Sequence, residues 1–126
     1  MAHVNFDGLN LRMTLERMER NAIHRKEVVI PRANIAGVEH ARDVWDRVRP
    51  QLTVLGIGYP GLLLIGIAET RGMQDFCILY RAWPGLVIQL RDHLYDRVLL
   101  SMPDDQAWPL FARLREITGG PVSRPA

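Results

Sequence analysis

The sequence predicts a mainly β protein of the α+β class. We expect an antiparallel β-barrel or sandwich of about seven strands, capped by a C-terminal amphipathic α-helix, with a short helix near residues 15–22. Two patterns predict this fold. Short apolar segments alternate with turn-forming Gly, Pro and Asp at close spacing, which favours antiparallel pairing over βαβ units. The last segment instead has apolar residues at helical spacing.

The chain length predicts a single domain. The sequence has 126 residues, and typical domains contain roughly 100–150. No linker or internal repeat divides it. We therefore expect residues 1–120 to form one domain and residues 121–126, two of which are prolines, to form a loose tail.

The N-terminal part predicts a hairpin followed by a helix. Segments 3–6 and 9–14 read as strands around Asp7-Gly8, a dipeptide typical of hairpin turns. Apolar residues at helical spacing then predict the helix over 15–22. Thr14 is its expected N-cap, with an incomplete capping box because an arginine rather than a glutamate stands three residues later.

The middle of the chain reads as a succession of strands. Proline is confined to strand ends, edges and bulges, so residues 27–31 and 35–39 are expected to form a strand that is broken near Pro31. Residues 39–49 are charged and are compatible with a loop or an edge strand. The further predicted strands are 52–57, 62–69, 74–80, 86–91 and 95–101.

One long segment carries no charge. From Pro50 to Ala68 there is no charged residue over 19 positions, close to the roughly 20 needed to cross a bilayer. A membrane span would leave two pieces of about 50 residues, which are small for independent domains. Tyr59-Pro60-Gly61-Leu62 also has the Pro-Gly signature of a type II turn. We therefore expect two buried strands around a turn.

The C-terminal helix is the clearest amphipathic element. Pro103-Asp104-Asp105 is a start signal and Gly119-Gly120-Pro121 a stop signal. Since proline is tolerated only in the first turn, Pro109 requires either a start near Gln106 or a kink. Asp104 and Asp105 are expected to cap the helix. The apolar face consists of Ala107, Leu110, Phe111, Leu114 and Ile117.

Positive charge is concentrated in one segment. The chain has 16 basic and 14 acidic residues, and residues 15–32 alone account for the net charge of +2. This distribution is not the footprint of a nucleic-acid-binding domain, so no nucleic-acid partner is expected. Three glutamates in the same segment predict only weak affinity for an acidic surface. The candidate anionic-surface contacts are Arg17, Arg20, Arg25, Lys26 and Arg32.

No motif indicates catalysis, a metal or a cofactor. Gly56-x-Gly58-x-x-Gly61 matches the letters of the dinucleotide fingerprint, but that motif needs a following helix. Here the next segment is short and broken by Gly66, so a turn between strands is expected. The four histidines and Cys77 lack the spacing of zinc ligands. We expect no catalytic residue, no metal and no cofactor.

The single cysteine indicates a reducing environment and is not expected to be catalytic. Cys77 cannot close an internal disulfide, so the chain is expected in a reducing, cytoplasmic environment. It lies in a run of apolar residues and is expected to be a core thiol rather than a nucleophile. The polar residues near the N-terminus predict no signal peptide.

The order of strands before one C-terminal helix resembles the bacterial pleckstrin-homology-like (PH-like) proteins, particularly the small single-domain ones of actinobacteria. The resemblance covers roughly residues 3–118 and implies a binding module with no catalytic residues. Lipid-binding PH domains hold a phosphorylated headgroup with basic residues near their first strands; the tight basic spacing of that site is not reproduced here. The resemblance is carried by segments 27–31, 35–38, 56–61, 75–80, 86–90 and 95–101 and the closing helix.

These observations predict a non-catalytic binding or assembly module. An exposed sheet edge can pair with another chain, which favours a homo-oligomer or a protein partner. Two alternatives remain open. One is a peripheral module at the inner face of the membrane with weak affinity for anionic lipid, and the other is a carrier of a small apolar ligand.

Overall fold

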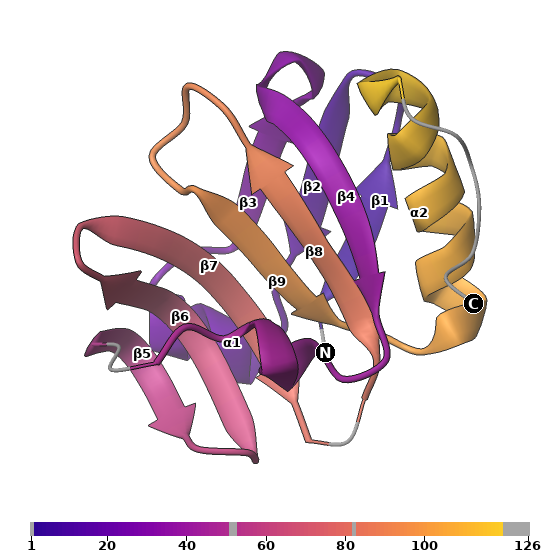
Figure 1. The fold of residues 1–126 in the computed structure, drawn as a ribbon. Coiled ribbons are helices and arrows are strands. Elements are labelled where there is room, and N and C mark those ends of the chain that lie inside the picture. The colour runs from indigo at the N-terminus through magenta and orange to yellow at the C-terminus, as the bar shows by residue number, and fades with distance from the viewer. Residues whose placement is uncertain (1, 51–52, 82, 120–126) are drawn as a thin grey trace.

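The computed structural model describes residues 2–50, 53–81 and 83–119 (Figure 1). Within these ranges the chain is mainly β, with nine strands in two sheets and a C-terminal helix. The predicted fold class is confirmed at this level. The number of strands exceeds the expected number of about seven. Eight strand segments are expected from the sequence, and one of them becomes two because residues 27–41 form strands in different sheets, separated by the 3-10 helix η1 (Arg32–Asn34).

The smaller sheet is antiparallel, in the order β1-β2-β3. As predicted, a hairpin turn at Asp7-Gly8 joins its first two strands. The Asp7 carboxylate accepts hydrogen bonds from the backbone N–H groups of Leu9 and Asn10 at 2.8 Å, and Gly8 has a positive φ of 95°. These strands are β1 (His3–Phe6), β2 (Asn10–Thr14) and β3 (Glu27–Pro31), with α1 (Arg17–Ile23) inserted between the last two.

The larger sheet has the order β4-β8-β9-β7-β6-β5. Its strands are β4 (Ile35–Ala41), β5 (Thr53–Tyr59), β6 (Leu63–Thr70), β7 (Met73–Tyr80), β8 (Gly85–Leu90) and β9 (Arg97–Ser101). The expectation of purely antiparallel pairing is wrong at one place, because β9 returns between β7 and β8 and therefore runs parallel to β7. The charged segment after β4 is no additional edge strand but contains the 3-10 helix η2 (Val44–Arg47).

Two hydrophobic cores cover the two faces of the larger sheet. The major core lies between this sheet, the smaller sheet and the C-terminal helix, and includes Leu11, Ile30, Phe76, Ile88, Val98 and Leu114. The minor core lies on the opposite face, beside η2, and includes Val44, Leu64, Cys77, Leu79 and Leu99. The centre of the sheet is thus buried on both sides. Of the two strands at its edges, β4 and β5, the strand β5 contributes no buried residue.

The C-terminal helix α2 (Asp104–Thr118) packs beside β4 (Figure 1). The helix starts directly after Pro103, so the alternative start near Gln106 is wrong. Gly119 ends it in the left-handed conformation at φ 78°, as the stop signal predicts. Its buried residues include four of the five predicted ones: Ala107, Leu110, Phe111 and Leu114.

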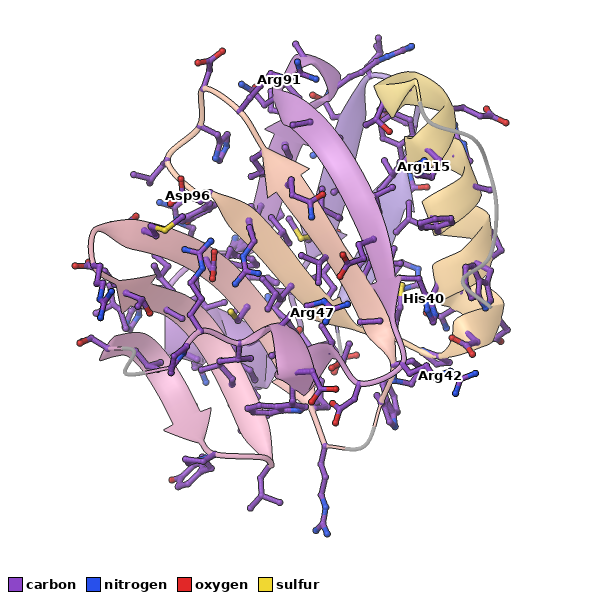
Figure 2. The ribbon with its side chains drawn as sticks, viewed as in Figure 1. His40, Arg42, Arg47, Arg91, Asp96 and Arg115 are labelled. Atoms are coloured by element: carbon purple, nitrogen blue, oxygen red, sulfur yellow. The ribbon has the colours of Figure 1, made fainter. Side chains whose placement is uncertain are left out.

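Asp104 does not have the predicted capping role. No side chain caps this helix at its N-cap residue. Instead Asp104 Oδ1 lies 2.8 Å from Nε2 of His40, a buried residue of β4. The His40 ring also stacks on Trp108, with 3.9 Å between the ring centroids. Figure 2 shows His40 on the side of β4 that faces α2, so this pair attaches the start of the helix to the sheet.

We predict that Phe111→Ala will lower the free energy of unfolding by about 3–5 kcal/mol, because the ring is only 6% exposed in the major core and its removal leaves a cavity. Chemical denaturation followed by circular dichroism measures this change. The control Leu9→Ala alters a side chain that is 73% exposed and should change stability by less than about 0.5 kcal/mol. Equal stability of the Phe111→Ala protein and its parent would contradict the packing of α2.

Candidate functional site

The edge strand β5 is the most exposed apolar element of the larger sheet. Leu55 is 73% exposed and Tyr59 is 60% exposed, and Val54 and Ile57 are only partly buried. The strand contains no charged residue and no proline. The expectation of two buried strands is therefore right for β6 and wrong for β5, because β5 ends the sheet and lies outside the part that both cores cover.

The glycines of this region serve the strand pairing and the turn. Gly56 pairs with Gly66 of β6, and a Cβ atom on Gly56 would lie 2.1 Å from the carbonyl oxygen of Ile65. The Leu62 N–H donates to the Tyr59 carbonyl at 2.9 Å, and Gly61 has φ 75°, as a type II turn requires. The segment after the turn is a strand, so these glycines do not form a phosphate-binding helix start.

A cleft opens on each face of β5. The cleft on the α1 side has a volume of about 870 Å³, and the cleft on the η2 side about 600 Å³. The apolar side chains of the α1 cleft are Met18, Ala22, Ile23, Leu55, Ile57 and Ile67. The η2 cleft is lined by Trp45, Val48, Val54, Gly58, Tyr59, Pro60, Gly61, Leu63 and Leu64. An apolar recess therefore flanks this sheet edge on either side.

The position of α1 beside β5 and β6 is fixed by a buried carboxylate. Glu19 is 0% exposed, and its Oε2 accepts a hydrogen bond from the Tyr80 hydroxyl of β7 at 2.5 Å. Its Oε1 accepts from the backbone N–H of Glu16 at 2.8 Å. Burial, together with the bond to Glu19, raises the pKa of Tyr80 above its ordinary value, so the phenol stays protonated and donates.

The same carboxylate corrects the predicted start of α1. The N-cap is Glu16 rather than Thr14, and Glu16 and Glu19 form the capping box that seemed incomplete. The helix ends at His24, which adopts the left-handed conformation at φ 61°. The prediction of Thr14 was wrong because Ser, Thr, Asn and Asp are the usual N-caps, whereas here a glutamate has this role.

Four of the five predicted basic residues lie together. Arg17, Arg20, Arg25 and Lys26 line a hollow of about 350 Å³ that extends along α1 to the residues directly after it, and we call it the basic hollow. Arg32 lies elsewhere, in η1, with Nη1 3.5 Å from the Gly8 carbonyl oxygen. The structure thus brings four of these residues together and separates the fifth.

Sequence reasoning missed two other residues of the basic hollow, Asn21 and His24. Asn21 lies one turn after Arg17 in α1, a spacing that could have been read from the predicted helix. The left-handed end of α1 brings His24 to the hollow, and no local motif predicts that conformation for a histidine. The α1 cleft was not predictable, because an uncharged segment such as residues 50–68 can be either buried or exposed at a sheet edge.

The buried ionic and thiol groups of the larger sheet form a separate cluster. Arg97 Nη2 and Nε bind the Asp75 carboxylate at 2.7 and 3.1 Å, and Arg49 Nε lies 3.6 Å from it. Cys77 is buried, as predicted, and burial raises the pKa of its thiol to about 12. Among the described residues, no group of three or more His, Cys, Asp or Glu could hold a metal ion.

None of the helices in the described ranges combines the length and the apolar character needed to cross a membrane.

We predict that Cys77 in the folded protein will not react with a thiol-specific disulfide reagent at pH 8. With a pKa of about 12, only about one thiol in ten thousand is ionised at that pH, and the thiolate is the reactive form. One equivalent of the reagent per chain should react once denaturant unfolds the protein. Rapid reaction of the native protein would contradict the burial of this thiol.

We predict that Tyr80→Phe will lower the free energy of unfolding by about 1–3 kcal/mol, because it removes a donor from the buried carboxylate of Glu19. Denaturant titration measures the loss. Tyr59→Phe is the matched control, since that ring is 60% exposed, and should have little effect. Equal stability of the two variants would show that the Glu19 contact does not hold α1.

Comparison with known proteins yields one weak similarity. No family model matches the chain, and no solved structure matches it. The chain is 28% identical over 89 residues to the UDP-N-acetylglucosamine–N-acetylmuramyl-(pentapeptide) pyrophosphoryl-undecaprenol N-acetylglucosamine transferase of Geobacter sp. (strain M21). The matched region is 70% of this chain but 24% of that transferase, so the chain spans about a quarter of the relative's length. A similarity of this extent assigns no family.

Proposed function

We propose that the protein is a non-catalytic assembly module that pairs through β5 with a second copy of itself. The observation that carries this proposal is an uncharged, exposed edge strand of seven residues. Such an edge presents unpaired backbone N–H and C=O groups that an added strand can satisfy. A strand added beside β5 would place its side chains alternately on the two faces of the sheet.

The other terminal strands of the two sheets are less suited to pairing. On β4, Glu39 adds charge, and the strand packs beside α2. On β3, Glu27 and Pro31 disfavour strand addition. On β1, the Phe6 carbonyl already accepts a hydrogen bond from Arg113 of α2. These contrasts favour β5 as the pairing edge.

The chemistry of the described residues is consistent with a role other than catalysis. The Cys77 thiol is buried and protonated, so it cannot act as a nucleophile from its place in the core. Asp75 is engaged by Arg97 in a bidentate ion pair. The pairing proposal uses backbone groups and apolar side chains and needs no reactive group.

Membership among the PH-like proteins is part of the same proposal. A pair of sheets with a C-terminal helix supports it. The parallel β7–β9 pair departs from the antiparallel arrangement expected for that resemblance. A cytoplasmic location is also proposed, and a single reduced cysteine is compatible with it.

We predict that the protein is associated at micromolar concentration and that Leu55→Lys weakens the association at least tenfold. The substitution places a charge at the edge without disturbing the core, since Leu55 is 73% exposed. Sedimentation over a hundredfold dilution series measures both effects.

Leu9→Lys is the control, because Leu9 is equally exposed but lies in the β1–β2 turn. It should leave the association unchanged. A single species of 14.4 kDa across the whole series would contradict self-assembly. Association that Leu55→Lys leaves intact would instead contradict the assignment of β5 as its site.

A further inference from the structure

The α1 cleft continues into the basic hollow. Arg17, Asn21 and His24 line both spaces. One end of this continuous surface is apolar, with Ile57 of β5 and Ile67 of β6 opposite the helix. The other end carries the cationic side chains of α1 and of the two residues that follow His24.

The apolar part has the form of a recess rather than a protruding surface. It lies between α1 and the two outer strands of the larger sheet, and its volume of about 870 Å³ is within the range of pockets that hold small molecules, roughly 300–1,000 Å³. Met18 is 47% exposed at its border. A single flexible alkyl chain can enter such a recess, whereas a flat bilayer surface cannot.

The cationic side chains of the basic hollow are less offset by neighbouring glutamates than the sequence suggests. Arg17, Arg20, Arg25 and Lys26 are all exposed, and the ion pairs formed among the described residues do not involve them. Two of the three nearby glutamates are engaged elsewhere. Glu19 is the buried residue of α1, and the Glu27 carboxylate pairs with Arg12 at 2.9 Å.

We infer that this surface binds a single-chain anionic amphiphile of the long-chain carboxylate type. The alkyl chain lies in the α1 cleft and the carboxylate is bound in the basic hollow, where arginine can form paired hydrogen bonds with it. The continuity of the two spaces through Arg17, Asn21 and His24 carries this inference. It concerns a small ligand and does not depend on the proposed strand pairing.

Isothermal titration with laurate, kept below its micellar concentration, tests the inference. We expect one molecule bound per chain. Decanoate, two methylenes shorter, should bind about sixteenfold more weakly, because each buried methylene improves affinity about fourfold. The uncharged 1-dodecanol should bind at least tenfold more weakly than laurate.

Matched variants locate the carboxylate. Arg20→Ala combined with Arg25→Ala should weaken laurate binding at least tenfold and leave 1-dodecanol binding unchanged. The control pair, Arg32→Ala with Arg42→Ala, removes the same charge outside the hollow and should change neither affinity by more than twofold. Arg42 follows the end of β4, near the start of α2 (Figure 2). All four side chains are exposed, so folding should be preserved.

A second variant tests the cleft independently of the arginines. Met18→Asp places a carboxylate at the border of the recess and should abolish laurate binding. Failure of laurate to bind the parent protein would overturn the inference, as would equal binding by the Arg20/Arg25 pair and the control pair. Binding to phosphatidylglycerol vesicles without binding of monomeric laurate would also overturn it, in favour of a membrane-surface patch.

Discussion

The buried carboxylate of Glu19 is the interaction on which the features around β5 depend. A helix of seven residues is too short to be stable in water by itself, so α1 must be held by contacts with the sheets. Burying a carboxylate is costly unless it is hydrogen-bonded, and here the Glu16 N–H and the Tyr80 hydroxyl satisfy it. One side chain thus stabilises the start of the helix and connects it to β7.

The location of α1 has consequences for both proposals. Because α1 packs against β5 and β6, it forms one wall of the α1 cleft. Its side chains Arg17 and Arg20 line the basic hollow. It does not cover the free edge of β5, whose Leu55 remains 73% exposed. The close Gly56–Gly66 pair keeps β5 attached to β6. The edge is therefore ordered in the sheet and still available to another strand.

Patterns among neighbouring residues in the sequence predicted the strands, the helices and the turn between β5 and β6 well. The strands at residues 3–6 and 27–31 have the predicted bounds, and α1 at 17–23 overlaps the predicted helix. These elements follow from alternation, turn residues and helical spacing, which are properties of neighbouring residues. The Tyr59–Leu62 turn was predictable for the same reason, since Pro and Gly restrict the backbone wherever they occur.

Properties that depend on distant residues were not predictable from these patterns. The parallel β7–β9 pair, with Asp75 beside Arg97, depends on the insertion of β9 between β7 and β8. The contact of His40 with Asp104 joins residues 64 positions apart. The exposure of β5 was missed because an uncharged strand reads the same at the centre and at the edge of a sheet. The burial of Glu19 beside the exposed basic side chains of α1 was likewise not predictable, because it depends on the distant Tyr80 hydroxyl.

The central claim is that β5 is an open edge in the monomer and the surface at which two molecules pair. Amide hydrogen exchange measured by mass spectrometry at several protein concentrations tests it most directly. The account predicts that protection of the amides of β5 rises with concentration, while protection in the central strand β9 stays constant. Protection of β5 that is independent of concentration, or a rise confined to β1 or β3, would contradict the claim.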